Sequence, residues 1–200
     1  MQGLDVPDLH PDPAVQVQEW VDAAVTAGVA EPTAMTLATA DVLGRPSVRA
    51  VLLKGLDERG AVFYTNYRSA KARDLDANPQ AALALVWPTL YRQVRITGPV
   101  TRTSEAESDT YFATRPPGSR LSAWASPQSA VIAERADLTR RVAEVAARHP
   151  DGLPRPAHWG GYRVALEQVE LWQARPDRLH DRLRYAQCDD GSWRIERLAP

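Results

Sequence analysis

MTLATADVLGRPSVRAVLLKGLDERGAVFYTN, residues 35–66, contains three strand-like segments in immediate succession. The segments 35–40, 47–55 and 61–66 are rich in apolar and β-branched residues, and the turn sequences DVLGRP and DERG separate them. Strands joined by such short turns pair with their neighbours in an antiparallel sheet. This stretch therefore predicts an antiparallel β architecture.

Strands and helices are expected on both sides of this stretch. The further strands cover 81–87, 93–100, 162–172 and a hairpin of 182–188 with 193–198 around Asp189-Asp190-Gly191. The helices cover 13–28, opened by Asp12-Pro13 and closed by Gly28; a short segment capped by Ser69 and ended by Pro79; a segment from the capping box Ser104-Glu105-Ala106-Glu107 to about Thr114, broken by a loop at 115–118; and 130–148. Runs of strands with helices between them favour a mostly β (α+β) fold, an antiparallel barrel with helices packed outside.

Composition excludes several classes of protein. The 200 residues carry 24 basic and 25 acidic side chains, a net charge of −1, which argues against nucleic-acid or membrane-surface binding. No apolar run approaches the roughly 18 residues of a membrane span. One domain over residues 1–200 is expected, with a flexible segment at 1–12. The acidic, proline-bearing N-terminus is not a targeting signal, and with one cysteine, Cys188, the expected location is the cytoplasm.

Several kinds of site lack a sequence signature. The four histidines, His10, His149, His158 and His180, do not have the close spacing of metal ligands, so no metal site is predicted. No G-x-G-x-x-G follows a strand, which disfavours a Rossmann dinucleotide site. No G-x-S-x-G supports a serine hydrolase.

Two segments near the centre of the chain concentrate polar groups. In Arg49-Ala-Val-Leu-Leu-Lys54 two cations flank an apolar strand, where they could be ordinary edge charges. Tyr64-Thr65-Asn66 runs toward a helix start that carries Ser69 and Lys71, and backbone N–H groups, a hydroxyl and an ammonium together suit an anion. The alternative there is a capped helix with a solvated lysine. Lys54 and Lys71 are the only lysines among the basic residues.

Two further segments lie toward the C-terminus. Tyr111, Arg115 and Ser119, followed by Gln128-Ser129, suit a phosphate or carboxylate, unless they form only a surface loop. After Trp172, the side chains of Arg178, His180 and Arg182 alternate and would share one face of an extended segment. Such a stripe is costly unless an anion or an electron-rich ring lies against it. The alternative is surface pairing with Asp177 and Asp181.

Together these segments resemble the pyridoxine/pyridoxamine 5′-phosphate oxidases. The likeness runs along nearly the whole chain from about Gly3, and it rests on the order and spacing of the motifs Arg49–Lys54, Phe63-Tyr-Thr-Asn66, Arg92-Gln-Val94, Tyr111-Phe112 with Arg115-Pro116, Ala123-Trp124 with Gln128-Ser129, Trp159-Gly-Gly-Tyr-Arg163, Leu166-Glu-Gln-Val-Glu170, Trp172-Gln173, Arg178-Leu-His-Asp-Arg182 and Arg197-Leu-Ala-Pro200.

The resemblance implies an antiparallel split β-barrel homodimer that binds FMN in clefts between the subunits. It implies that Arg49 and Lys71 hold the FMN phosphate, with Gln128 and Ser129 contributed by the partner subunit. The flavin would be lined by Tyr64, Thr65 and the strand residues Arg49, Ala50, Val51, Leu52, Leu53 and Lys54, and contacted at its isoalloxazine by Gln93, Trp172 and Arg182. Lys54, Tyr111, Arg115 and Ser119 would hold the substrate phosphate. Arg178 and His180 would lie over the substrate ring as the catalytic pair.

The implied activity is the oxidation of pyridoxine 5′-phosphate or pyridoxamine 5′-phosphate to pyridoxal 5′-phosphate, with molecular oxygen giving hydrogen peroxide. Two alternatives remain: oxidation of a dihydro-aromatic intermediate, as in phenazine biosynthesis, and a non-catalytic flavin- or pyridoxal-phosphate-binding protein. Two departures from the family pattern matter. A basic, tyrosine-containing arm is usual before Gly3, and here Asp5-Val6-Pro7 follows instead of basic residues. Ala70 stands where an arginine is usual, and Arg68 is a candidate substitute.

Overall fold

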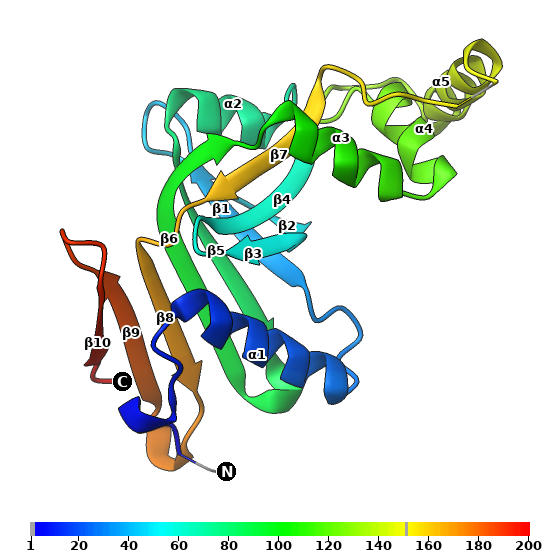
Figure 1. Ribbon diagram of the computed structural model, residues 1–200. Coiled ribbons are helices and arrows are strands. Elements are labelled where there is room, and N and C mark those ends of the chain that lie inside the picture. Colours follow the sequence, from blue (N-terminus) through cyan, green and yellow to red (C-terminus); the bar gives the residue numbers. More distant parts are fainter. Residues whose placement is uncertain (1–2, 151) are drawn as a thin grey trace.

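The computed structural model describes residues 3–150 and 152–200, and an antiparallel sheet dominates it (Figure 1). Its ten strands are β1 Ala34–Ala40, β2 Pro46–Leu52, β3 Gly55–Asp57, β4 Gly60–Asn66, β5 Gln80–Trp87, β6 Arg92–Arg102, β7 Trp159–Val164, β8 Gln168–Gln173, β9 Asp181–Gln187 and β10 Trp193–Arg197. The main path runs β10-β9-β8-β6-β5-β1-β2. A side branch, β3-β4-β7, joins it through β6.

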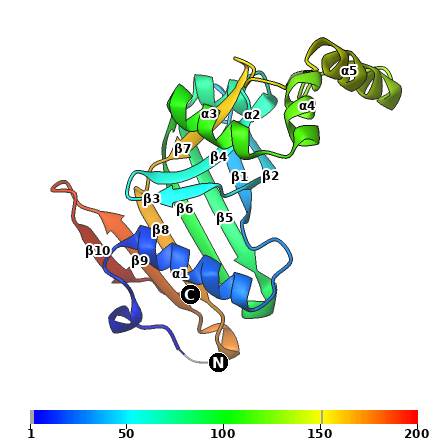
Figure 2. The same ribbon diagram turned by 45° about the vertical axis from the view of Figure 1, so that its right-hand side comes forward.

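The helices lie around this sheet. They are α1 Pro13–Thr26, α2 Ala70–Ala77, α3 Glu105–Thr114, α4 Pro117–Ala125 and α5 Arg135–Arg148, with 3-10 turns η1 Val6–Asp8, η2 Pro88–Leu90 and η3 Pro176–Arg178. Figure 1 shows α1 lying across one face of the sheet, and Figure 2 shows α5 projecting from the body of the molecule. The predicted antiparallel split barrel with flanking helices is confirmed.

The long strand β6 makes the sheet curl. Residues 92–97 of β6 pair with both β5 and β8, while residues 100–102 pair with β7. One strand thus belongs to two halves of the barrel. The sheet closes tightly at Gly98, where an added Cβ would strike the backbone carbonyl of Ala165.

The core lies between the sheet and α1. Alternate residues of the central strands point inward, among them the fully buried Leu37, Leu83 and Val94. The helix α1 adds Val17 and Trp20 to the same cluster. Its start is the predicted one, because the Asp12 side chain accepts a hydrogen bond from the backbone N–H of Ala14 and Pro13 is the first helical residue.

The opposite face of the sheet stays exposed. This face carries Val48 and Leu52 on β2 and Val86 on β5, whose exposed fractions are 67%, 40% and 51%. Along each strand they alternate with residues that face the core. Between them lie small side chains, Ala38, Ala82 and Ala84. A flat, apolar sheet face of this kind is typical of an interface rather than of a solvated surface.

Several expected elements differ from the observed ones. The strand expected at 47–55 is divided into β2 and β3 at Leu53 and Lys54, and the strand region 162–172 is two strands. The loop expected at 115–118 contains the start of α4, because a proline at the first helical position opens a helix as readily as it breaks one. The last helix begins at Arg135, not at 130.

The N-terminal segment contacts the rest of the protein. Residues 1–2 lie outside the described residues, but residues 3–12 make defined contacts. Leu4 and Leu9 are buried, and the backbone N–H of Leu4 donates to Asp181 Oδ2 at 3.0 Å. The segment is therefore attached to β9 in this structure.

We expect Gly98→Ala to destabilise the protein by about 1–3 kcal/mol, because its Cβ must displace the Ala165 carbonyl at the joint between β6 and β8. Urea unfolding measures the change. Gly118→Ala is the matched control, since no atom lies within 4 Å of a Cβ there. Equal stability of the two variants would contradict the tight closure.

Candidate cofactor- and substrate-binding site

A cavity of about 310 Å³ gathers most of the residues singled out in the sequence. It lies where β2 ends, beside β4, the start of α2, the end of α3 and the loop after α4. Its lining consists of Ala50, Val51, Leu52, Lys54, Tyr64, Thr65, Lys71, Tyr111, Arg115, Gln128 and Trp159. Segments from Ala50 to Trp159 therefore meet at one site.

The cavity is cationic. Lys54, Lys71 and Arg115 line it, and its lining includes no carboxylate. Lys71 is only 8% exposed, and its Nζ donates to the hydroxyls of Thr65 at 3.2 Å and Ser69 at 3.4 Å. Burial, and then the positive charge of Arg49, lower the pKa of Lys71. A desolvated ammonium next to a second cation is a site for a doubly charged anion.

The neighbouring cation, Arg49, lies on the core-facing side of β2, and hydrogen bonds orient its guanidinium. Its guanidinium donates to Thr39 Oγ1 at 2.6 Å and to Ser47 Oγ at 2.7 Å, and it lies 3.5 Å from Asp74 Oδ2. Thr39 in turn donates to Asp74 at 2.6 Å. The arginine is thus held beside α2 without lining the cavity itself.

The start of α2 contributes to the anion site in an unexpected way. Ser69 occupies the capping position but makes no side-chain cap; its hydroxyl accepts from Lys71 instead. The first N–H of the helix, that of Ala70, donates to Ser129 Oγ at 3.1 Å. Gln128 Oε1 accepts from Thr65 Oγ1 at 3.1 Å and from the N–H of Asn66 at 3.3 Å.

These contacts correct one expectation. Gln128 and Ser129 were expected from a partner subunit, but they reach the site within one chain. The cause is α4, which the sequence did not predict: it returns the chain across the start of α2, so that the residues just after it meet Thr65 and Ala70.

Aromatic rings form one wall of the cavity. Tyr64 stacks on Tyr111 with ring centroids 4.0 Å apart and on Trp159 at 5.5 Å. The guanidinium of Arg115 lies 4.5 Å from the Trp159 ring, and its Nη1 is buried without a hydrogen-bond partner among the described residues. Burial lowers the pKa of Arg115 and raises that of Tyr111. An unpaired, buried guanidinium nitrogen indicates that a ligand completes it.

Trp159 was not assigned a role from the sequence. The signal that identifies it is the Gly-Gly pair that follows. A Cβ at Gly160 would strike the Tyr67 hydroxyl, and one at Gly161 would lie 2.9 Å from the Tyr64 ring. Both glycines are needed for β7 to pass this close to the aromatic wall, which places the Trp159 ring over the cavity.

Like Arg49 and Ser129, the expected residues Leu53 and Ser119 do not line the cavity. Leu53 is 6% exposed and belongs to the hydrophobic core, because the chain breaks between β2 and β3 at this point and turns its side chain inward. Ser119 lies half-buried in the first turn of α4. Arg68, the candidate substitute for an arginine at position 70, lines a separate hollow of about 330 Å³.

The remaining expected residues form a second group on another part of the sheet. Gln93 on β6 pairs with Trp172 on β8, and Trp172 pairs with Arg182 on β9. His180 packs on Trp172 with ring centroids 4.6 Å apart. Between β2 and β6 lie two strands, so Gln93 is about three strand spacings, or roughly 14 Å, from the cavity's β2 wall. Arg182 is about two spacings farther. The two groups do not converge within one chain.

The expected alternation of Arg178, His180 and Arg182 on an extended segment is wrong. Arg178 ends the turn η3, and Asp177 and Arg178 have φ of 58° and 60°. Only Arg182 lies in a strand, where its Nε donates to Glu170 Oε1 at 2.8 Å. Within the described residues no ion pair joins Arg178 or His180 to a carboxylate, so the alternative of surface pairing with Asp177 and Asp181 is not observed either.

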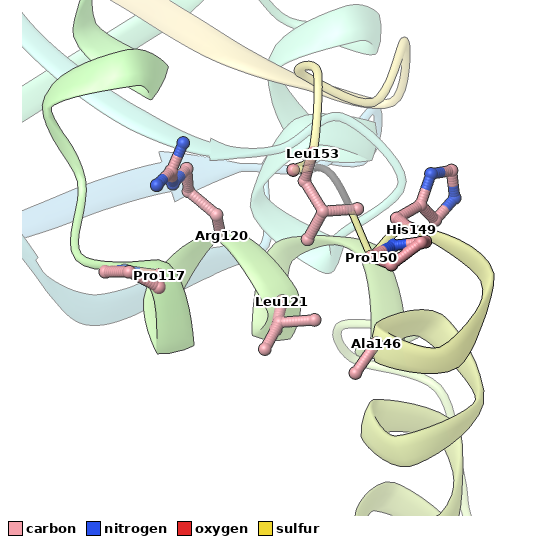
Figure 3. A pocket seen from close by; sticks show the side chains of 8 residues that line it. Pro117, Arg120, Leu121, Ala146, His149, Pro150 and Leu153 are labelled. Atoms are coloured by element: carbon pink, nitrogen blue, oxygen red, sulfur yellow. The ribbon is translucent and has the colours of Figure 1, made fainter.

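Another hollow, of about 260 Å³, lies between α4 and α5 (Figure 3). It is lined mainly by apolar groups, including Pro117, Leu121 and Leu153, and it shares no lining residue with the cationic cavity. Among residues 3–150 and 152–200, no cluster of three or more His, Cys, Asp or Glu side chains could hold a metal ion. No helix in the same residues is long and apolar enough to cross a membrane.

Comparison with known families identifies the family of this chain. Residues 21–149 match the family model described as pyridoxamine 5′-phosphate oxidase. Residues 159–200 match the pyridoxine 5′-phosphate oxidase C-terminal dimerisation region. The chain belongs to the pyridoxamine 5′-phosphate oxidase family. It is therefore an FMN-dependent oxidase, as the sequence predicted.

Individual relatives agree with this placement. The chain is 56% identical over 198 residues to pyridoxine/pyridoxamine 5′-phosphate oxidase 1 of Ralstonia nicotianae, covering 99% of this chain and 93% of that protein. It is 55% identical over 200 residues to the corresponding oxidase of Burkholderia thailandensis, covering 99% and 94%. Among solved structures, PhzG from Burkholderia lata in complex with tetrahydrophenazine-1-carboxylic acid superposes with a TM-score of 0.93 at 34% identity, covering 100% of this chain and 98% of that one.

The cationic cavity fits the phosphate end of FMN. Lys71 is a buried ammonium with hydroxyl partners only, Arg49 lies beside it, and the start of α2 adds its dipole to both. Gln128 and Ser129 lie at the same helix start. A phosphate dianion would neutralise the two cations and would relieve the cost of burying Lys71.

Lys71→Met tests this assignment. We expect FMN affinity to fall by about 1.5–3 kcal/mol, roughly ten- to a hundredfold, because a charge-assisted contact is lost. The FMN-free variant should be no less stable than the FMN-free parent: the lowered pKa of Lys71 means that protonation favours the unfolded chain below that group's ordinary pKa, and methionine removes this penalty.

Fluorescence titration with FMN and thermal unfolding of the FMN-free proteins give the two quantities. Arg73→Met is the control, since it removes an exposed cation from the same helix. A variant that loses stability and keeps its FMN affinity would show that Lys71 is only structural.

Proposed function

We propose that this protein oxidises pyridoxine 5′-phosphate and pyridoxamine 5′-phosphate to pyridoxal 5′-phosphate, with molecular oxygen as the electron acceptor and hydrogen peroxide as a product. The amine substrate also consumes one water molecule and releases ammonia. The observation that carries the proposal is the buried Nη1 of the Arg115 guanidinium, which has no hydrogen-bond partner among the described residues, in an aromatic cavity lined by three cations and no carboxylate. A planar ring that bears a phosphate ester matches both features. The names of the relatives at 55–56% identity support the same substrates.

The substrate phosphate would be held by Lys54 and Arg115, with the Tyr111 hydroxyl as a further donor. All three line the cavity. Ser119 would join them only through a small movement of the first turn of α4, since it does not line the cavity. Arg115 can bind two phosphate oxygens at once with its planar fork, and Lys54 adds a point charge.

Bound FMN supplies the two-electron acceptor for the hydride that leaves the substrate carbon. The residues of this chain bind and orient: Arg49, Lys71, Gln128 and Ser129 would hold the phosphate of the cofactor, and the backbone segment 50–54 with Tyr64 and Thr65 would line it. Arg178 and His180 would position the substrate ring. Positioning of this kind accounts for much of the rate when the cofactor performs the chemistry.

A homodimer would bring the second group of residues to the first. Gln93, Trp172 and Arg182 are separated from the cavity within one chain, yet the resemblance assigns them to the same flavin. The exposed apolar face around Val48, Leu52 and Val86 offers the surface for pairing. The C-terminal match to a dimerisation region supports it. A two-fold axis across this face would create two equal sites.

A second candidate is the oxidation of a dihydro-aromatic carboxylic acid. The TM-score of 0.93 to PhzG, whose structure holds tetrahydrophenazine-1-carboxylic acid, favours it. The same cations and rings could receive a carboxylate on a fused ring system. The lower identity to that protein, 34% against 55–56%, ranks it second.

Oxygen uptake by the FMN-loaded protein distinguishes these functions. We expect pyridoxine 5′-phosphate to be oxidised with a kcat/KM about a hundredfold higher than that of unphosphorylated pyridoxine, because at least one charge-assisted phosphate contact is lost. Tetrahydrophenazine-1-carboxylic acid is the third substrate. If it is oxidised faster than the phosphate ester, the first assignment is wrong.

Mixed dimers test the shared site. Arg115→Gln disables the cavity and Arg178→Ala disables the ring-positioning loop, so each homodimer should be nearly inactive. After random mixing, half of the dimers contain one subunit of each variant. In such a dimer one shared site contains both substitutions and the other contains neither, so we expect about a quarter of the parental activity. Each variant refolded alone is the control. A mixture no more active than its components would mean that each site is built from one chain.

A further inference from the structure

The connection between β8 and β9 carries Arg178 and His180 on a strained backbone. Asp177 and Arg178 both have φ near +60°, a left-handed conformation that side chains with a Cβ seldom adopt. Neither residue is a glycine or an asparagine, and the turn η3 that contains them is closed by one backbone hydrogen bond, from the N–H of Leu179 to the carbonyl of Pro176 at 3.1 Å. Such a conformation persists only where the surroundings fix both ends of the segment.

Asp181 makes the contacts that hold the two ends of this segment in place. Its carboxylate, 17% exposed, accepts from the backbone N–H of Leu4 at 3.0 Å and from Arg197 Nη1 at 3.0 Å, and it lies 3.5 Å from Arg175 Nε. Arg175 precedes the strained turn and Asp181 follows it, so this ion pair closes the connection on itself. Figure 1 shows the connection beside the N-terminal segment, in agreement with the Leu4 contact.

The same closure orients His180. Its Nδ1 accepts a hydrogen bond from the backbone N–H of Arg175 at 3.1 Å, and its ring packs on Trp172. In a neutral imidazole an accepting Nδ1 leaves the proton on Nε2. Nε2–H is then the group with which His180 can donate a hydrogen bond to a ligand. The position of the Arg175 backbone N–H therefore determines which ring nitrogen carries the proton.

We infer that Asp181 is a positioning residue: through Arg175, it holds the connection 175–180 closed and keeps His180 as a hydrogen-bond donor at Nε2. This inference rests on the proposed function for its consequence, since His180 acts there on the substrate ring. Asp181 itself contacts neither the cationic cavity nor any residue that lines it. Its loss should therefore change substrate handling and leave FMN binding unaltered.

Asp181→Asn in the FMN-loaded enzyme tests this inference, with Asp190→Asn in the exposed turn between β9 and β10 as the matched control. We expect the rate of flavin reduction by pyridoxine 5′-phosphate to fall about tenfold or more, because a small misplacement of an orienting group has effects of this size. FMN affinity should stay within about twofold of the parent. The control should match the parent in both quantities.

Nitrogen-15 NMR of histidine-labelled protein supplies a readout that a merely structural role would not move. In the parent, the His180 signal, assigned by its absence in His180→Gln, should show an unprotonated Nδ1 and a protonated Nε2. In Asp181→Asn it should shift toward a mixture of both tautomers. Parental tautomer and parental reduction rate in this variant would overturn the inference.

A second variant and the tautomer measurement cover two further outcomes. If Asp181→Asn fails to fold or to retain FMN, Arg175→Gln is the second variant; it leaves the Leu4 and Arg197 contacts of Asp181 in place, and the same two shifts are expected. If the parent does not oxidise the phosphate ester, the proposed function fails, while the tautomer measurement still decides whether Asp181 and Arg175 orient His180.

Discussion

Hydrogen bonding by one strand, β6, connects both groups of residues to which we assign the proposed site. Its first half pairs with β5 and β8, and its last residues pair with β7. Through β7 it supports Trp159 and the aromatic wall of the cavity; through β8 it supports Trp172 and the connection to β9. The curl of the sheet at Gly98 sets these two halves apart. The separation of the cavity from Gln93 and Arg182 within one chain is thus a consequence of how the barrel closes.

The cavity buries two cations in surroundings that disfavour their charged form, which folding alone would not favour. Lys71 is buried beside hydroxyls and another cation, and Arg115 keeps a buried nitrogen without a partner. Other arginines of the described chain pair with carboxylates: Arg163 lies between Asp57 and Glu107, and Arg182 meets Glu170. Arg120 also keeps a buried nitrogen without a partner among the described residues, but it does not line the cavity. In the cavity, where three cations lie together without a carboxylate in the lining, an anionic ligand is the simplest physical reason.

The sequence predicted the positions of most strands, and it singled out most of the residues that line the cavity, because local signals indicate both. A strand end that runs into a helix start identified Thr65 and Lys71, and turn sequences identified the hairpins. It missed α4 because Pro116-Pro117-Gly118 satisfies the rule for a helix break and the rule for a helix start equally well. The assignment of Gln128 and Ser129 to another subunit came from the resemblance, and their contacts with Thr65 and Ala70 in the same chain correct it. The extended segment at 178–182 failed for a different reason: nothing in Asp177 or Arg178 indicates positive φ, which tertiary contacts impose.

Those tertiary contacts come from the two ends of the chain. Asp181 joins the N-terminal segment through Leu4 and the last strand through Arg197, and Arg197 also donates to the Leu4 carbonyl and to Asp5. Residues 4, 181 and 197 are thus tied into one small network, next to the only strained non-glycine pair in the connection. Local sequence rules cannot detect such a network, because its members are 16 to 193 residues apart. If the connection orients the substrate as we propose, its geometry depends on the packing of Leu4 and Arg197 against Asp181, so that segments distant in the sequence must pack together before the connection takes this conformation.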